Sequence, residues 1–260
     1  MELNYLFGRP VRAARPSADG RRELFILGAY PSALYVCWTA PALPRPIQAV
    51  AVDNEPEPFW TGDDEHERIE QWQRDVSFRE SWGRVSACGR LNGSSGRWVK
   101  EQVLSPLGAA RSQAWITDCL DIYYESEQAA VHLEQPAVRE AISRLGIRPR
   151  CLLPHPSEAA IVREALAAHA ERLGAEIRTA RPELIVTLGN AALRVLAALA
   201  ESSEPRLGRL SPDLQTYGCV GRVQVDGRSV AWLPLAHPGA PGPYQRAHAA
   251  WVQSRRTTGQ

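Results

Sequence analysis

Short apolar runs recur along the chain, separated by longer segments in which apolar residues return at helical spacing. Four runs have the length of a buried strand, at residues 24–27, 47–52, 114–117 and 184–188. Two further runs, 220–225 and 230–235, flank the Asp226-Gly227 dipeptide, which is a strong hairpin signal. The pattern therefore predicts at least four strands and one hairpin.

Helical spacing predicts helices over residues 65–82, 97–104, 136–145, 158–179 and 191–200, and a final short helix through Trp251. Pro136 suits the first turn of its helix, and Ser157 is a good N-cap for the longest one. His169 lies on the apolar stripe of that longest helix, so we expect a packed core histidine. Residues 54–64 and 121–135 are expected to be irregular.

Strands that alternate with helices predict an α/β fold, a three-layer α/β/α sandwich with a central, mainly parallel sheet. We expect one domain over residues 1–260. In such sheets the ligand site lies beyond the carboxyl ends of the strands. Three segments fall at such ends, residues 28–32, 117–121 and 236–242. The topology alone therefore predicts that these segments share a site.

Composition narrows the function classes. The chain has 260 residues, 44% of them apolar, and a formal net charge of +1. This balance argues against a strongly basic coat protein but leaves room for a local DNA-binding patch. The five cysteines are widely spaced with no C-x-x-C pair, so we expect no metal site and no disulfide framework. Without a signal peptide or a membrane-spanning run, we expect a cytoplasmic protein.

Four motifs in sequence order resemble the uracil-DNA glycosylase superfamily. Leu27-Gly-Ala-Tyr-Pro-Ser32 resembles the post-strand motif written G-Q-D-P-Y, G-x-N-P-G or G-E-A-P-G. Trp115-Ile-Thr-Asp118 resembles the Y-I-T-N of the iron–sulfur branch, and residues 182–189 resemble that branch's R-P-x-V-I-V-A-L-G strand. Leu235-Ala-His-Pro-Gly239 resembles the H-P-S or H-P-A motif that carries the catalytic histidine. The resemblance spans residues 22–254.

The resemblance implies a monomeric enzyme that removes a pyrimidine-type base from double-stranded DNA without a cofactor. His237 would stabilise negative charge on the base O2 as the glycosidic bond breaks. The alternative for His237 is a structural role in a Pro-Gly loop. The branch with the iron–sulfur cluster needs four cysteine thiolates, and this chain lacks the closely spaced pair, so we expect no cluster.

The first motif departs from the family. Tyr30 stands where a water-activating Asp or Asn is usual, and Ala29 where the iron–sulfur branch has Glu. The nearest downstream polar residues are consecutive, Asp53, Asn54 and Glu55. We expect this segment to position water or to stabilise the sugar cation.

Asp118 stands where the family reads the base with Asn. An ionised Asp only accepts hydrogen bonds, so it would repel the uracil O4 and accept from the cytosine N4 amine.

Ser32 replaces a bulky Tyr of the G-Q-D-P-Y branch and leaves room for a C5 substituent, although Tyr30 could refill that space. With Gly28 these residues would form the base pocket. The substrate would be a C5-modified cytosine, as in some phage DNA, which implies a defence enzyme. Alternatively, Asp118 caps a segment or pairs with an arginine.

A base must leave the duplex before it is cut. Phe59 and Trp60 could stack on it, or pack in the core. The resemblance places an intercalating wedge after His237, where Pro241 or Tyr244 could serve. Arg246 could hold a phosphate, or be a solvated surface residue.

Three other functions stay open. The first is uracil repair with an altered motif. The second is a non-catalytic member that binds DNA or a partner, since Asp, Asn and Glu are missing from the first motif. The third is an unrelated α/β protein that binds a nucleotide, against which the absence of a G-x-x-x-x-G-K-[ST] loop counts.

Overall fold

The computed structural model describes residues 2–16, 18–203 and 209–258. The chain forms two compact units, each built from three segments. Unit 1 comprises Met1–Ala14, Pro31–Gly96 and Ile122–His155, and unit 2 comprises Arg15–Tyr30, Arg97–Asp121 and Pro156–Gln260. The chain thus passes between the units five times, after residues 14, 30, 96, 121 and 155. The assignment of residues 1–260 to one domain stays a prediction.

The central sheet of unit 2 has the order β5–β1–β6–β9–β8–β7 among the described residues. β5, β1, β6 and β9 run parallel to one another, whereas β8 pairs antiparallel with β9 and β7 pairs antiparallel with β8. All five residues of β1 are buried, as expected for a central strand that reads as one apolar run. The strands are β1 Leu24–Gly28, β5 Ala114–Asp118, β6 Leu184–Leu188, β7 Ser202–Ser203, β8 Gly221–Val225 and β9 Arg228–Leu235.

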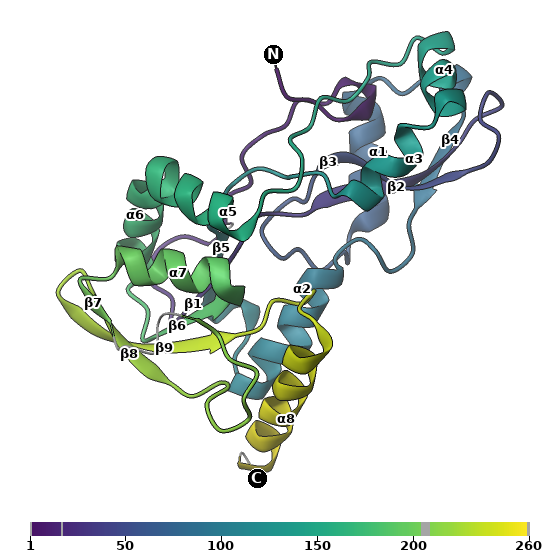
Figure 1. The fold of residues 1–260 in the computed structure, drawn as a ribbon. Coiled ribbons are helices and arrows are strands. Elements are labelled where there is room, and N and C mark those ends of the chain that lie inside the picture. The colour runs from purple at the N-terminus through teal and green to yellow at the C-terminus, as the bar shows by residue number, and fades with distance from the viewer. Residues whose placement is uncertain (1, 17, 204–208, 259–260) are drawn as a thin grey trace. The chain divides into compact units, whose positions relative to one another are not determined.

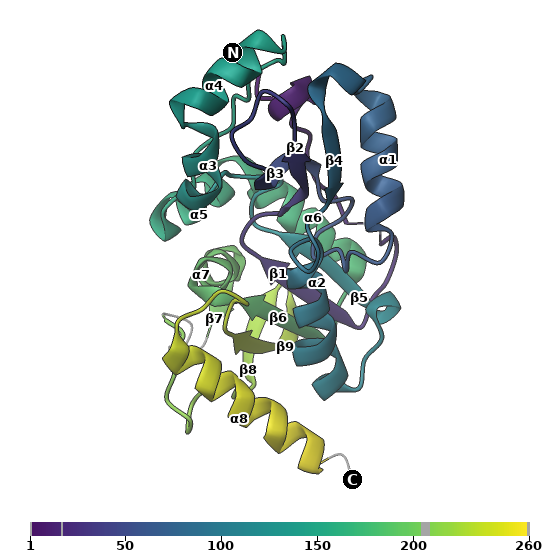
Figure 2. The same ribbon diagram turned by 90° about the vertical axis from the view of Figure 1, so that its right-hand side faces the viewer.

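Helices cover both faces of this sheet, which confirms the predicted α/β/α sandwich. In Figure 1, α5, α6 and α7 lie on one face, and α8 lies on the other with the helix that continues from α2. The yellow α8 and green α7 can also be followed in Figure 2. Ser157 caps α5 as predicted, since its hydroxyl accepts from Ala160 N at 3.2 Å. The helices are α2 Ser94–Val99, α5 Glu158–Glu164, α6 Ala170–Ala180, α7 Gly189–Leu199 and α8 Gly242–Thr258, with π-helices at Lys100–Leu104 and Ala165–His169.

Unit 1 is built on a separate antiparallel sheet, in the order β3–β2–β4. Its elements are β2 Ala33–Thr39, β3 Ile47–Asn54, β4 Arg84–Ala87, α1 Glu65–Asp75, α3 Glu127–Leu133 and α4 Pro136–Arg144. Pro136 occupies the first turn of α4, as predicted. The sequence pattern therefore located β3 and α4, but it did not distinguish their antiparallel unit from the parallel sheet of unit 2.

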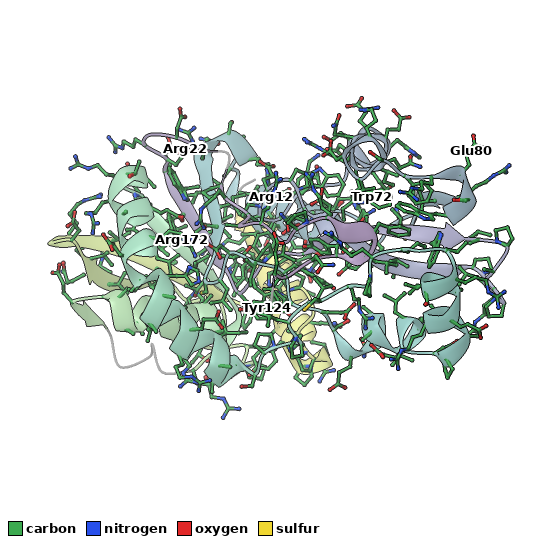
Figure 3. All side chains as sticks on the ribbon, turned by 90° about the horizontal axis from the view of Figure 1, so that it is seen from above. Arg12, Arg22, Trp72, Glu80, Tyr124 and Arg172 are labelled. Atoms are coloured by element: carbon green, nitrogen blue, oxygen red, sulfur yellow. The ribbon has the colours of Figure 1, made fainter. Side chains whose placement is uncertain are left out.

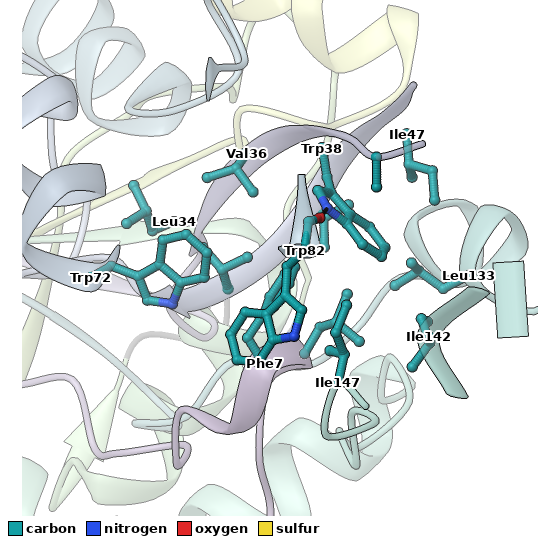
Figure 4. Close-up of a cluster of buried hydrophobic side chains, with 14 of the residues drawn as sticks. Phe7, Leu34, Val36, Trp38, Ile47, Trp72, Trp82, Leu133, Ile142 and Ile147 are labelled. Atoms are coloured by element: carbon teal, nitrogen blue, oxygen red, sulfur yellow. Dashed lines mark hydrogen bonds between the residues drawn. The ribbon is translucent and has the colours of Figure 1, made fainter. Parts of the chain in front are cut away.

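An aromatic cluster forms the core of unit 1 (Figure 4). The ring of Phe7 lies 5.3 Å from that of Trp38, 5.5 Å from Trp72, 5.3 Å from Phe78 and 5.6 Å from Trp82, between ring centroids. Phe7 itself has a φ of +73°, a left-handed conformation that is costly for a side chain of this size. Burial of its ring among four aromatic partners offsets that cost.

Three sequence predictions are corrected here. The helix expected over residues 65–82 ends at Asp75, and Ser77 then takes a φ of +50°, which turns Phe78 and Trp82 into the aromatic core. The segment 121–135, expected to be irregular, contains α3, capped by the Ser126 hydroxyl. The final helix continues past Trp251 to Thr258. Strands β2 and β4 were not predicted.

Candidate active site

The carboxyl ends of four parallel strands of unit 2 meet at one edge of the sheet. Gly28, the last residue of β1, pairs in register with Asp118, the last residue of β5, and Cys119 N donates to Gly28 O at 3.1 Å. Leu188 of β6 pairs in the same way with Leu235 of β9. The predicted segments around residues 28, 118 and 237 therefore lie along this edge.

His237 follows β9 and is exposed to solvent. Gly239 N–H donates to His237 Nδ1 at 3.2 Å, and Ala240 N–H donates to the His237 carbonyl at 2.9 Å. Because Nδ1 accepts a hydrogen bond, a neutral ring carries its proton on Nε2. The tight turn thus gives His237 one defined donor.

Gly189, the residue after β6, allows the His237 turn to lie close to the end of that strand. Gly189 has a φ of +87°, and a Cβ placed on it would lie 3.2 Å from His237 Cβ. A side chain at this position would be strained in its backbone and would crowd the histidine. In the sequence, Gly189 stood out only as the last residue of the motif at 182–189.

Asp118 is buried, with 3% of its surface exposed and both carboxylate oxygens shielded from water. Along β5, side chains alternate between faces, so Asp118 points away from the face that carries Thr117. Because the carboxylate is buried, a base would contact Asp118 only after the carboxylate became exposed. Its role in reading a base stays a prediction.

Arg172 of α6, labelled in Figure 3, holds the end of β5 and was missed by sequence analysis. Its Nη2 donates to the carbonyls of Asp118 and Cys119, both at 2.9 Å, and its Nη1 donates to Thr117 Oγ1 at 3.2 Å and to Glu176 Oε1 at 3.0 Å. A guanidinium suits this task because its donors are rigidly arranged. The signal that could have pointed to it is the Arg-x-x-x-Glu pair, Arg172 and Glu176, on one helix face.

A second group gathers just beyond β5. The carboxylate of Asp121 pairs with Arg15, and its Oδ2 lies 3.8 Å from His169 Nδ1. Burial lowers the pKa of His169, and the negative charge of Asp121 opposes that shift. His169 is partly buried and faces a carboxylate, so it is not the packed core histidine expected from its position on the apolar stripe.

The segment after His237 is largely exposed. Pro241 and Arg246 are exposed, whereas Tyr244 is partly buried and its hydroxyl donates to Leu210 O at 3.1 Å. Of the two wedge candidates, Pro241 is therefore the accessible one. Their contacts with DNA stay predictions.

The polar segment at the end of β3, residues 53–55, lies in unit 1, and each of its three side chains has a partner there. Asp53 Oδ2 accepts from Arg9 Nε at 3.0 Å, Asn54 Oδ1 accepts from the Tyr5 hydroxyl at 2.8 Å, and Glu55 Oε1 accepts from Ser32 N at 2.8 Å. Burial raises the pKa of Asp53, and the Arg9 charge opposes the shift. These bonds explain the three residues structurally, and their role toward water stays a prediction.

The remaining candidates are also divided between the units. Ser32, Phe59 and Trp60 belong to unit 1, and Tyr30 to unit 2. Trp60 is 5% exposed, packs in the aromatic core and donates to Asp64 Oδ1 at 2.7 Å. Phe59 is equally buried. Core packing therefore accounts for both rings, and stacking on a base stays a prediction.

Within the described segments, no three His, Cys, Asp or Glu side chains lie close enough together to hold a metal ion. The five cysteines are free thiols. None of the described helices is both long enough and apolar enough to cross a bilayer.

A scan against models of known protein families finds no match to this chain. A search of curated protein sequences also finds no significant match.

Proposed function

We propose that the protein is a DNA glycosylase that hydrolyses the N-glycosidic bond of a flipped-out pyrimidine, with His237 as the donor to the departing base. The observation that carries the proposal is the Gly239 N–H bond to His237 Nδ1, at 3.2 Å, in an exposed turn at the carboxyl edge of a parallel sheet. This bond leaves the Nε2–H of a neutral ring as a fixed donor. A neutral, oriented imidazole is what a developing oxyanion requires.

In the proposed reaction, the C1′–N1 bond breaks and its electron pair leaves with the base. Negative charge then spreads onto the base O2, where the His237 Nε2–H donates. Water attacks C1′ and loses a proton, which ends on the released base. One preorganised donor of this kind lowers the barrier by roughly 3–4 kcal/mol. The sugar would carry positive charge in the transition state, which a carboxylate would stabilise.

We propose double-stranded DNA as the partner of a monomeric enzyme. Support comes from the exposed segment after His237, where Pro241 could enter the duplex and Arg246 could contact a phosphate. A wedge that fills the gap left by a flipped base lowers the cost of unstacking. Asp118 would select a base that carries an amine, and Ser32 would admit a C5 substituent. A modified cytosine in invading DNA fits both features.

The test is an abasic-site cleavage assay on matched duplexes. The duplexes contain one uracil, cytosine, 5-hydroxymethylcytosine or glucosylated 5-hydroxymethylcytosine at the same position. We expect strand breaks only with a C5-modified cytosine, and none with the His237→Ala variant. Breaks on uracil alone would instead favour uracil repair.

A second candidate is a protein that binds DNA without cutting it. It is favoured by one observation: Asp53, Asn54 and Glu55 are all engaged inside unit 1, while Ala29 and Tyr30 supply no carboxylate. Binding to all four duplexes with no abasic sites on any of them would favour this candidate and overturn the proposed glycosylase.

A further inference from the structure

Two buried side chains of unit 2, Tyr217 and His248, support the turn that carries His237. Ala236 N, the amide just before His237, donates to the Tyr217 hydroxyl at 2.7 Å. The same hydroxyl lies 2.8 Å from His248 Nδ1, and His248 Nε2 lies 3.0 Å from the carbonyl oxygen of Gln102. A continuous path of hydrogen bonds therefore joins the helix of Gln102 to the His237 turn.

The direction of each bond follows from the chemistry of the groups. The Gln102 carbonyl can only accept, so the proton of a neutral His248 ring sits on Nε2. His248 Nδ1 must then accept, and the Tyr217 hydroxyl at 2.8 Å supplies the proton. The Tyr217 oxygen is thereby left to accept from Ala236 N–H. Every donor in the path meets one acceptor.

Burial holds this arrangement in its neutral form. Tyr217 is 6% exposed and His248 is 4% exposed. Burial raises the pKa of Tyr217 and lowers the pKa of His248, so neither group is charged near neutral pH. The His248 ring also lies between two indoles, 4.7 Å from Trp98 and 5.4 Å from Trp251 by ring centroids. Its orientation is therefore fixed by packing as well as by hydrogen bonds.

The sheet explains why such a support is needed. The pairing of β9 with β6 ends at Leu235, and its pairing with β8 ends earlier, at Trp232. Ala236 lies beyond both partner strands, and its buried amide needs an acceptor. The Tyr217 hydroxyl supplies that acceptor at the residue where the chain leaves the sheet.

We propose that Tyr217 and His248 are positioning residues that hold the His237 turn in place and so keep the ring within reach of the Gly239 N–H, which sets its tautomer. This inference rests on the proposed function of His237 as a donor to the departing base. Tyr217 anchors the residue before His237, and Gly239 N–H fixes the ring itself. A turn held at both Ala236 and Gly239 keeps the Nε2–H of His237 in one direction. A turn held only at Gly239 samples other positions.

The main experiment uses Tyr217→Phe, which removes the hydroxyl and keeps the buried ring. The matched control is Tyr123→Phe in unit 1, where a tyrosine of similar burial accepts from the Tyr35 hydroxyl at 3.1 Å. Single-turnover excision at saturating enzyme should fall about five- to tenfold in Tyr217→Phe, the effect of one lost buried hydrogen bond. Affinity for DNA should stay constant, and Tyr123→Phe should keep the wild-type rate.

A double-mutant cycle separates positioning from general destabilisation. If Tyr217 acts through His237, Tyr217→Phe has no further effect in a His237→Ala background. An equal fold-loss in both backgrounds would overturn the proposal. His248→Leu should match Tyr217→Phe, and His248→Asn should lose less activity because its side-chain oxygen can accept near the position of Nδ1. These two variants keep the test decisive if Tyr217→Phe does not fold.

A final measurement does not depend on excision. The ¹⁵N shifts of the His237 ring should report a protonated Nε2 and an unprotonated Nδ1 in the wild type. In Tyr217→Phe the two shifts should move toward each other as the tautomers mix. Unchanged shifts would overturn the positioning role even if the protein cuts DNA. Changed shifts in a protein that cuts no duplex would support the positioning role and reject the glycosylase.

Discussion

Two polar segments lie at strand ends in this protein, and they differ in the exposure and bonding of their side chains. His237, after β9 in unit 2, is exposed, and its ring is oriented by a backbone amide. Asp53, near the end of β3 in unit 1, is tied to Arg9, which also reaches Asp75 at 3.0 Å. The first segment carries an oriented ring at an exposed sheet edge, and the second closes a local ion-pair network.

The difference comes from the sheets. Parallel strands end together at one edge, and the turns beyond that edge lie outside the regular hydrogen-bonded ladder. In unit 1, the polar residues at the end of β3 bond to Arg9, Tyr5 and Ser32 of the same unit. Function is therefore best sought first at the parallel edge, and the sharpest tests compare the two segments directly.

The largest effect is expected from His237→Ala. Loss of a transition-state donor should lower single-turnover excision by at least about a hundredfold, with DNA affinity nearly unchanged. The control is His66→Ala on the exposed side of α1, which should cut at the wild-type rate. A His237→Ala protein that cuts as fast as this control would remove the assigned role.

A smaller effect is expected from Asp118→Asn, a change that keeps size and removes charge. If Asp118 reads the base, the variant should lose about tenfold to a hundredfold in rate on an amine-bearing pyrimidine and gain on uracil. Single-turnover rates on matched duplexes measure both changes. Equal rate losses on both bases would show that Asp118 supports β5 without selecting the base.

The smallest effect is expected in unit 1, where Asp53→Asn and Asp75→Asn form a matched pair. Each variant removes one carboxylate partner of Arg9. Only Asp53→Asn should lower excision if Asp53 positions water or stabilises the sugar cation. Equal rates in the two variants would assign Asp53 to structure alone.

Asp53 also makes a prediction about pH. Burial raises its folded-state pKa above the ordinary value of 3.8. A carboxyl with a raised folded pKa favours the folded state below the unfolded pKa, and this contribution is lost as pH rises through the folded pKa. Asp53→Asn should therefore remove part of the fall in unfolding free energy above about pH 4. Denaturant unfolding at several pH values measures this change.

Much of the α/β fold follows from local pattern. The apolar runs of β1, β5 and β6 and the Asp226-Gly227 hairpin were predicted because each carries its own signal. β2 was missed although Ala33–Thr39 is rich in apolar and β-branched residues, since its Pro31 flank reads as a turn. α3 was missed because seven residues are too few to establish a helical period.

The site was predictable only where a motif carried it. His237 was found from its place beyond a predicted strand and from the His-Pro motif that resembles the family's. Arg172, Tyr217 and His248 were not, because their partners lie far along the chain: Tyr217 and Ala236 are 19 residues apart, and His248 and Gln102 are 146 apart. Such contacts exist only after the sheet and its covering helices have assembled.

The alternation of the chain between two units has a consequence for how the protein is made. The last segment of unit 1 ends at His155, whereas β6, β8 and β9 of unit 2 come later. A growing polypeptide can therefore complete unit 1 while β1 and β5 still lack the strands on their other side. The apolar β1 waits for β6 as synthesis proceeds at roughly 5–20 residues per second. During synthesis, the side of β1 that will pair with β6 is therefore the exposed sheet edge to which a chaperone could bind.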